Sequence, residues 1–186
     1  MKKTILFIFM TLSILSNKSQ QFKNYNKPLA ELLSDSLFLN KPVIVCVEKS
    51  KYKLSIMIDS ITVKAYPVVF GGNPIDDKLK QGDKCTPEGK FKIRTKYPHQ
   101  SWSKFIWIDY PNEDSWAKHK QAKAVNKIPE NANIGGEIGI HGVPEGMDYL
   151  IDNRINWTLG CISMKNIDVE EIYPYLNENT EVKIVH

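Results

Sequence analysis

Histidine and cysteine are scarce in this chain of 186 residues, which contains four histidines and three cysteines. No short local spacing among them resembles a zinc-binding motif, so a site built from His99, His119, His141 and a cysteine is not expected, and no metal is predicted. The spacing of the cysteines is also not that of a small disulfide scaffold. Their odd number leaves at least one thiol unpaired within a monomer. A disulfide between Cys46 and Cys85 stays open, because sequence cannot show whether their Cα atoms lie within about 4.4–6.8 Å.

An excess of charge of one sign is lacking as well. The formal net charge is +4, and Lys2, Lys3 and Lys18 all lie in the first twenty residues, so the rest of the chain is close to neutral. Proteins that bind nucleic acid usually carry a basic stripe. The remaining lysines are spread among acidic residues, as on a solvated surface. No nucleic-acid partner is therefore expected.

The sequence has no apolar run of about twenty residues, the length that a membrane-spanning helix needs. Its longest apolar stretch runs from Ile5 to Leu15 and follows two lysines, which is the layout of a secretory signal. We predict a signal peptide over residues 1–19, an exported protein of the periplasm or cell envelope, and no membrane span after processing. A buried N-terminal strand or helix is the alternative. No cysteine follows the apolar run, which disfavours a lipid-anchored start.

Internal repeats and low-complexity tracts are also missing, and the length suits one compact domain. Residues 20–41 read as a polar linker with a short helical stretch at Leu29–Leu33. From residue 42 the pattern is that of short strands separated by polar turns. Short helices are expected at 112–124 and from Asn166, where Asn would cap the helix and Pro174 would end it. We predict a mainly β domain over residues 42–186 with one or two short helices; the expected strands are 43–47, 52–58, 61–66, 91–93, 105–108, 138–140 and 181–185.

Two short segments carry candidate chemistry. His141-Gly142 follows an expected strand, and Gly160-Cys161 precedes an expected helix. A neighbouring imidazole can lower the pKa of a thiol from about 8.5, so that the thiolate attacks a carbonyl and the imidazolium protonates the leaving amine. Backbone N–H groups at Gly160 and Cys161 would hold the oxyanion, each contributing roughly 3 kcal/mol. The alternatives are a buried structural thiol and an ordinary core histidine.

These segments resemble the signature of the YkuD-type L,D-transpeptidase family. His141-Gly142 is separated by sixteen residues, counted after the histidine, from Thr158-Leu159-Gly160-Cys161. The family motif has His, a spacer of similar length, then Ser or Thr, a variable residue, Gly and Cys. An earlier stretch, Gly82 to Phe91, is similar to the family's Gly-Asp-x-x-Thr-Pro-x-Gly-x-Phe. Two motifs in the right order extend the resemblance over about residues 42 to 186.

The resemblance implies a β-sandwich or barrel-like catalytic domain that acts on peptidoglycan stem peptides. Cys161 would be acylated at the carbonyl of the third stem residue, a diamino acid, with release of the terminal D-alanine. An amine acceptor would then resolve the thioester into a cross-link. No metal or organic cofactor is implied. Two other functions stay open: a hydrolase of the same fold, with water as the acceptor, and a non-catalytic module that binds the cell wall.

Further residues are candidates for supporting roles. Thr158 is expected to orient the catalytic loop or His141. Arg154 could meet a substrate carboxylate, because guanidinium and carboxylate match in geometry. Tyr149 and Trp157, with Gly142, could line the peptide site, although aromatic residues more often pack under loops. His99 and His119 are expected to be exposed. Two positions depart from the family pattern: Leu159 stands where many members carry His or Arg, and Ser163-Met164 replaces an Arg- or Asn-bearing tail. The sequence leaves the acceptor and the oligomeric state open.

Overall fold

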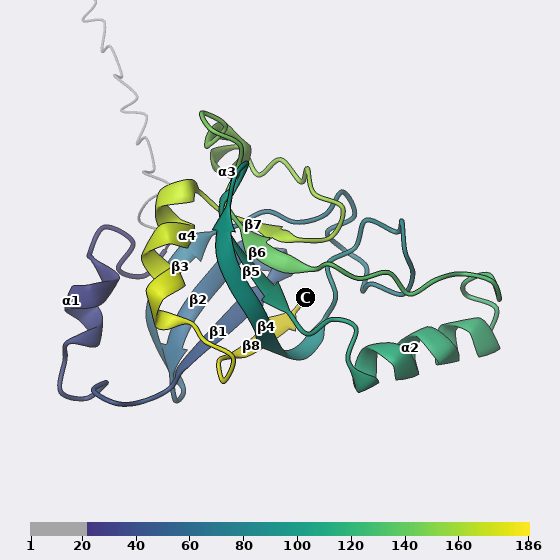
Figure 1. Cartoon of the computed structure of the whole chain (residues 1–186), viewed down its shortest axis with the longest axis horizontal. Coiled ribbons are helices and arrows are strands. Elements are labelled where there is room, and N and C mark those ends of the chain that lie inside the picture. Colours follow the sequence, from purple (N-terminus) through teal and green to yellow (C-terminus); the bar gives the residue numbers. More distant parts are fainter. Residues whose placement is uncertain (1–21) are drawn as a thin grey trace, which may run out of the picture.

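The computed structural model describes residues 22–186, so the predicted signal peptide lies outside the described residues. Strands dominate the fold, as predicted, and within the described range four short α-helices accompany them (Figure 1). In chain order the elements are α1 (Leu29–Leu33), β1 (Val43–Glu48), η2 (Lys49–Lys51), β2 (Lys53–Ile58), β3 (Ile61–Pro67), β4 (Gly89–His99), β5 (Ser103–Ile108), α2 (Glu113–Ala124), β6 (Gly139–His141), α3 (Tyr149–Asp152), β7 (Ile162–Ser163), α4 (Asn166–Ile172), η3 (Tyr173–Tyr175) and β8 (Glu181–Val185).

The strands form one sheet in the order β3-β2-β1-β8-β4-β5-β6-β7. The sheet has two halves, β3-β2-β1-β8 and β5-β6-β7, which are joined by β4. The first residues of β4 pair with β8, and its later residues pair with β5. Its register shifts between Ile93 and Thr95, and such an irregularity bends a strand. Beyond β3, Val69 exchanges two backbone hydrogen bonds with Ser163 of β7, at 2.8 and 2.9 Å. The chain leaving one end of the sheet therefore reaches the other end, which gives the barrel-like closure that was expected.

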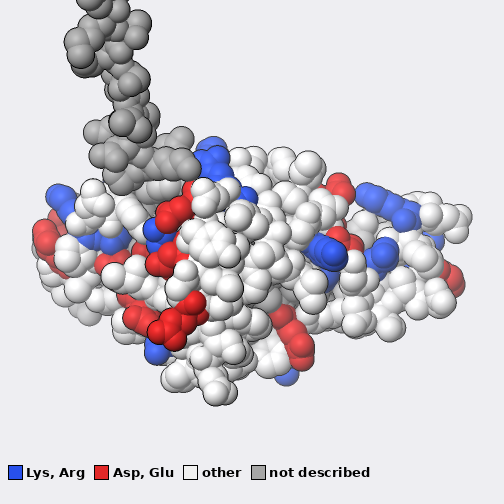
Figure 2. Space-filling model, turned by 90° about the horizontal axis from the view of Figure 1, so that it is seen from above, with Lys and Arg blue, Asp and Glu red and all other residues white. Residues whose placement is uncertain are grey.

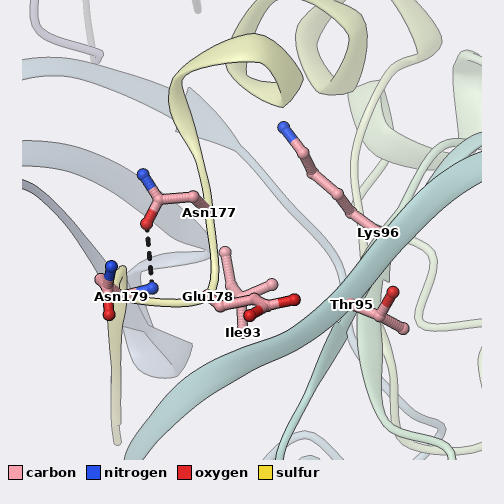
Figure 3. A pocket seen from close by; sticks show the side chains of 6 residues that line it. All are labelled: Ile93, Thr95, Lys96, Asn177, Glu178 and Asn179. Atoms are coloured by element: carbon pink, nitrogen blue, oxygen red, sulfur yellow. Dashed lines mark hydrogen bonds between the residues drawn. The ribbon is translucent and has the colours of Figure 1, made fainter.

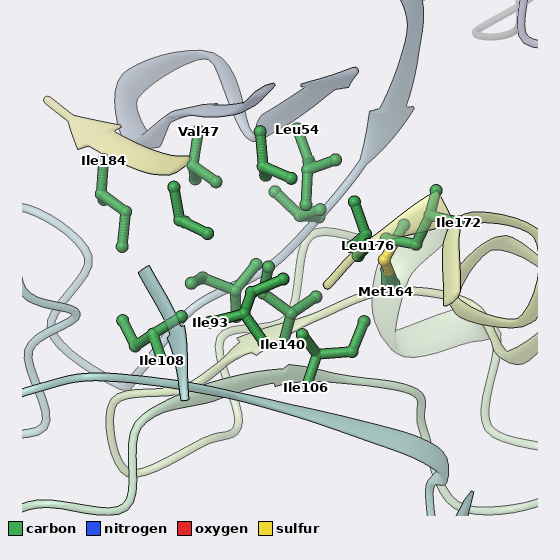
Figure 4. Close-up of a cluster of buried hydrophobic side chains, with 14 of the residues drawn as sticks. Val47, Leu54, Ile93, Ile106, Ile108, Ile140, Met164, Ile172, Leu176 and Ile184 are labelled. Atoms are coloured by element: carbon green, nitrogen blue, oxygen red, sulfur yellow. The ribbon is translucent and has the colours of Figure 1, made fainter. Parts of the chain in front are cut away.

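The core lies between the two halves of this bent sheet. Figure 4 shows side chains of β1, β2 and β8 pointing toward those of β4, β5 and β6 across the interior. The alternation of apolar residues along these strands produces this arrangement, because successive side chains point to opposite faces. Each fully buried aliphatic side chain contributes roughly 2 kcal/mol by leaving water. The core residues labelled in Figure 4 that lie on strands are Val47, Leu54, Ile93, Ile106, Ile108, Ile140 and Ile184.

Two of the expected helices form, with one difference at a cap. Asn112 caps α2, and its Oδ1 accepts a hydrogen bond from Ser115 N at 3.1 Å. Asn166 begins α4 but does not cap it, so the predicted cap is wrong; its side chain instead accepts from Val143 N at 3.0 Å. α4 ends before Pro174, which lies in η3, as the proline predicts. α3 and β7 were not predicted, since neither is long enough to show a period.

The segment that precedes β1 packs along the edge strand β3. Lys23 O accepts from Ala65 N at 2.9 Å, and Asn24 Nδ2 donates to Val63 O at 2.8 Å. Leu29 of α1 is fully buried in the main core. Residues 22–41 therefore cover an edge that would otherwise expose unpaired backbone groups. Figure 1 places α1 at this end of the molecule and α2 at the opposite end.

The charged side chains are mixed over the surface. On the face seen in Figure 2, Lys and Arg lie among Asp and Glu on both sides of a broad uncharged area. Several surface ion pairs join the two signs, such as Lys41 Nζ with Asp59 Oδ2 at 2.8 Å. Among residues 22–186, none of the helices combines the length and the apolar character that a bilayer crossing requires.

Candidate active site

The histidine and cysteine motifs meet where β6 and β7 lie side by side. The two strands are parallel, and His141 is opposite Ser163. Cys161 lies two residues before Ser163, so the same register sets it beside Gly139. Because alternate residues of a strand share one face, the Cys161 side chain lies on the face that carries the imidazole of His141. The fold thus places His141 at the end of β6 and Cys161 directly before the neighbouring strand β7.

The imidazole of His141 is held in one tautomer. Its Nδ1 lies 2.7 Å from Gly142 O, and since a carbonyl oxygen can only accept, Nδ1 carries the proton. Nε2 is then the unprotonated nitrogen that can take a proton from a nucleophile. His141 is only 1% exposed, and this burial lowers its pKa to about 4. The ring is therefore a neutral base at pH 7.

Gly142 supports His141 through its backbone. Its N–H donates to Trp102 O at 3.0 Å, and its carbonyl also accepts from Ser163 Oγ at 3.1 Å. A Cβ atom here would overlap Asn166 Oδ1, so only glycine allows this close approach. Both backbone groups of Gly142 are occupied within the protein. The structure gives this residue a place behind the histidine, and its expected contact with substrate stays a prediction.

The thiol of Cys161 is protonated at rest. Its Sγ donates to Glu137 O at 3.4 Å, and burial raises its pKa to about 11. Together with the low pKa of His141, this makes a neutral thiol and a neutral imidazole at pH 7. The sequence argument expected a thiolate–imidazolium pair, whereas this environment favours proton transfer to His141 as the sulfur attacks.

The loop that carries Cys161 is held by Thr158. Thr158 Oγ1 donates to Cys161 O at 2.8 Å and accepts from Gly160 N at 3.2 Å. Gly160 has φ 144, and a Cβ atom on it would lie 2.8 Å from Cys85 O. Within residues 22–186, the Cys161 N–H has no hydrogen-bond acceptor. Of the two N–H groups expected to hold an oxyanion, Gly160 N–H is engaged by Thr158 and Cys161 N–H is free to do so.

Asp83, in the earlier Gly-Asp motif, organises the loop behind Gly160. Its carboxylate accepts from the backbone N–H groups of Leu79, Lys80 and Cys85 at 2.8, 2.9 and 3.1 Å. It also forms a buried ion pair of 2.8 Å with Lys78. These bonds hold the pKa of Asp83 below its usual value, although burial opposes them. The two motifs are thus joined, because the carbonyl of Cys85 packs directly against Gly160.

Aromatic rings surround the imidazole of His141. Trp102 stacks on it with centroids 4.4 Å apart and an interplanar angle of 26°, and Phe105 lies parallel to it at 5.7 Å. Trp157 meets the ring edge at 5.5 Å. Sequence reasoning named Trp157 but missed Trp102 and Phe105. The alternation of residues 103–108 could have placed Phe105 on one face, but nothing local shows that this face meets His141.

The remaining predicted binding residues lie in the segment before the catalytic loop. Tyr149 is on α3 and half exposed. Arg154 is exposed, and its guanidinium lies 5.3 Å from the ring centre of Tyr52. Leu159 is 76% exposed and points away from the core. Of the expected substrate-contacting side chains, the structure brings Trp157 against His141.

Two other expectations concern histidine and cysteine. His119 is buried, with Nδ1 2.6 Å from Leu79 O, so its predicted exposure is wrong. The polar sequence of α2 hid this, because the residues that cover His119 come from a distant loop. His99 is partly exposed and stacks on Trp102.

All three cysteines are free. Within residues 22–186, no three potential metal ligands cluster together.

Two cavities lie outside this constellation. One, of about 540 Å³, opens between the 73–85 loop and α2. The other, of about 340 Å³, lies between β4 and the turn before β8, where Asn179 N donates to Asn177 Oδ1 at 2.9 Å (Figure 3). Neither cavity is lined by Cys161 or His141. The candidate chemistry therefore belongs to the β6–β7 site and not to these hollows.

Comparison with known proteins identifies the family of the domain. The family model for the L,D-transpeptidase catalytic domain, YkuD, matches residues 42–184. The match includes both sequence motifs and every strand except the last residue of β8. A search of curated proteins finds no match.

Solved structures share the fold. The helical cell shape determining protein Pgp2 from Campylobacter jejuni is 21% identical, with a TM-score of 0.56, and Bd1075 from Bdellovibrio bacteriovorus is 18% identical, with 0.54. In each case the likeness covers 78% of this chain and 48% of the other, so the chain spans about half the length of these proteins. An L,D-transpeptidase from Xylanimonas cellulosilytica is 13% identical, with a TM-score of 0.51, over 78% of this chain and 61% of that one.

Proposed function

The chain belongs to the YkuD family of L,D-transpeptidase catalytic domains, and from that membership we propose that it is a cysteine acyltransferase acting on peptidoglycan stem peptides. Cys161 is the nucleophile and His141 is the general base. The observation that carries the proposal is the tautomer of His141: Gly142 O holds the proton on Nδ1, on a strand beside the one that Cys161 precedes. This supports the proposal, because acyl transfer by a cysteine uses a base that is itself oriented by a third group.

The acylation step follows from these groups. Nε2 of His141 takes the thiol proton as Sγ of Cys161 attacks the carbonyl carbon of the third stem residue. The oxyanion that forms is held by the Cys161 N–H. When the tetrahedral intermediate collapses, the bond to the terminal D-alanine breaks, and its amine takes the proton from the imidazolium. The products are a thioester on Cys161 and free D-alanine, with His141 neutral again.

The second step uses the same groups in the same order. An amine of another stem loses a proton to Nε2 as it attacks the thioester carbonyl, and the leaving sulfur takes the proton back. The product is an amide cross-link between stems. Water in place of the amine would give a shortened stem with a free carboxylate, so transfer and hydrolysis differ only in the acceptor.

Supporting residues follow from their places in the site. Thr158 and Gly160 shape the loop that presents the Cys161 N–H. Trp157 lies against His141 and forms a wall beside the stem peptide. Tyr149 and Arg154 lie in the segment that leads to Trp157, and we propose that they contact the more distant part of the stem, Arg154 through a carboxylate. Export through residues 1–19 would bring the domain to this substrate in the cell envelope.

The test is intact-mass analysis of the purified protein with a disaccharide tetrapeptide, with Cys161→Ser beside the natural chain. We expect a thioester adduct on the natural chain, release of D-alanine, and neither with Cys161→Ser. Cross-linked dimers among the products indicate transfer, whereas shortened monomers indicate hydrolysis. Wall binding without D-alanine release or adduct would contradict the proposal and favour a non-catalytic module. N-terminal sequencing of the mature protein from the envelope fraction tests the export signal.

A further inference from the structure

We propose that Trp102, at the tip of the β4–β5 hairpin, is a positioning residue for His141: its ring contacts the imidazole, and its backbone carbonyl binds Gly142, the residue that orients the imidazole. Because His141 is the base of the proposed reaction, the role of Trp102 in turnover rests on the proposed function. The contact itself can be tested without substrate.

The first contact is a backbone hydrogen bond between Trp102 and Gly142. Trp102 lies in the turn between β4 and β5, and its carbonyl accepts from Gly142 N at 3.0 Å and from Lys104 N at 2.6 Å. Gly142 is the residue whose own carbonyl binds Nδ1 of His141. The hairpin tip is thus attached, through the N–H, to the residue whose carbonyl fixes the histidine tautomer.

The second contact is with the imidazole ring of His141. The indole of Trp102 stacks on the imidazole at a centroid distance of 4.4 Å, shorter than those of Phe105 and Trp157, at 5.7 and 5.5 Å. Trp102 therefore contacts both the imidazole plane and the residue that supplies the acceptor of its Nδ1 proton. A misplacement of about 1 Å in a catalytic group can cost about a hundredfold in rate. Contacts that hold the imidazole in place can therefore affect the rate of the proposed reaction.

Trp102 is itself held in place from β4. Its indole stacks with the imidazole of His99 at 4.4 Å and 8°, and His99 Nδ1 accepts from Ser101 N at 3.2 Å. The hairpin tip is thus organised before any substrate arrives. This second stack explains how a half-buried tryptophan in a turn can keep one orientation.

The charge on His141 is the property that this arrangement controls. Among the titratable groups, His99 from β4 stacks on Trp102 and acts electrostatically on His141, and Cys161 lies on the loop that precedes β7. The other neighbours are uncharged: the rings of Phe105 and Trp157 contact the imidazole, and Asn166 of α4 binds Val143 N, next to Gly142. By covering the imidazole, the indole excludes water and disfavours protonation at rest. Its electron-rich face also attracts the imidazolium that forms during turnover.

The experiment compares Trp102→Ala and Trp102→Phe with Trp116→Ala, a matched control on the exposed side of α2. The pKa of His141 is measured by NMR titration of the substrate-free protein, and kcat and KM are measured with the stem tetrapeptide across pH. With Trp102→Ala we expect the pKa of His141 to rise toward its ordinary value of about 6.5. The acid limb of kcat should move with it, and kcat should fall about ten- to a hundredfold with KM little changed. Trp102→Phe should restore most of both, and Trp116→Ala should change neither.

An unmoved His141 titration in a folded Trp102→Ala protein would overturn the inference, as would a loss of kcat that Trp102→Phe does not restore. If Trp102→Ala does not fold, Trp102→Leu takes its place, because it fills space without an aromatic face, and the same outcomes apply. A shifted titration in a protein whose natural form never releases D-alanine would overturn the proposed function alone. Turnover with an unmoved titration would overturn the role of Trp102 alone.

Discussion

The side-chain oxygen of Asn166 occupies the space that a Cβ atom of Gly142 would need. The same oxygen accepts a hydrogen bond from Val143 N at 3.0 Å. The first residue of α4 therefore seats the chain directly after His141 and allows nothing larger than glycine there. Packing from behind the histidine therefore restricts position 142 to glycine.

Gly142→Ala should damage the site and the fold together. The new methyl group would overlap Asn166 Oδ1 and come within 2.6 Å of Trp102 O. We expect a loss of roughly 1–3 kcal/mol in the free energy of unfolding, typical of overpacking, and a fall in D-alanine release greater than the folded fraction explains. Urea unfolding and initial rates measure the two effects. Gly136→Ala is the matched control, since a Cβ atom there meets no atom within 4 Å; equal effects of both changes would contradict the packing argument.

The acid limb of the acylation rate should lie well below that of an ordinary histidine. Burial lowers the pKa of His141 to about 4 and raises that of the Cys161 thiol to about 11. His141 is protonated, and lost as a base, only when the pH falls through about 4, so kcat/KM should stay nearly level from about pH 5 to 9. The measurement is kcat/KM for D-alanine release from pH 3.5 upward. A midpoint near 6.5 would show that the imidazole is solvated in the working enzyme.

Asp168→Asn should stabilise the protein at neutral pH. Burial raises the pKa of Asp168 from 3.8 to about 7, so the folded state holds a proton there that the unfolded chain releases. The carboxyl group therefore favours folding most at low pH, and this contribution is lost as pH rises from about 4 through 7. The variant should unfold with a free energy higher by roughly 2–4 kcal/mol at pH 8, with the difference vanishing near pH 4. Urea unfolding at pH 4, 6 and 8 checks this, with the exposed Glu130→Gln as control; a pH-independent difference would refute it.

Asp83→Asn should loosen the loop behind the nucleophile. It removes the partner of Lys78, whose side chain is only 3% exposed, and weakens three backbone bonds of the 79–85 loop. Breaking a buried ion pair costs about 3–5 kcal/mol. We also expect faster hydrogen exchange at residues 158–161, because Cys85 O packs on Gly160.

The matched control for that change is Asp59→Asn. It breaks an exposed ion pair of the same 2.8 Å length with Lys41, and exposed pairs are worth about 0–1 kcal/mol. If the two variants unfold with the same free energy, burial of the Lys78–Asp83 pair has no special weight.

The local sequence pattern predicts some strands of the fold accurately and others only in part. Alternation in 43–58 and 181–185 predicts elements that the structure forms almost residue for residue. β4 was expected only at Phe91–Ile93 but runs over Gly89–His99. Its second half is rich in Lys, Arg and polar residues and becomes a strand because β5 pairs with it. Partner pairing decided that element, and it is the one that carries the hairpin over His141.

Asn166 and His119 show why the remaining predictions failed. Asn166 is a good helix cap by type, yet its side chain is used by Val143, which reaches it only through the β6–β7 pairing. His119 lies in a polar helix with no apolar face to suggest burial, and its imidazole is covered because the 78–80 segment packs over it. In both cases a contact with a residue distant in sequence outweighed the local preference.

What the sequence determined by itself is the set of local features: the strand periods, the glycines that the loops require, and the two motifs that carry His141 and Cys161. The tertiary structure alone decided the surroundings of that pair, namely the stack of Trp102, the seat that Asn166 gives the Gly142–Val143 segment, and the burial that makes both reactive groups neutral. The physical reason is that side-chain identity and spacing are properties of neighbouring residues along the chain. Desolvation, ring stacking and strand register arise only when distant segments pack together.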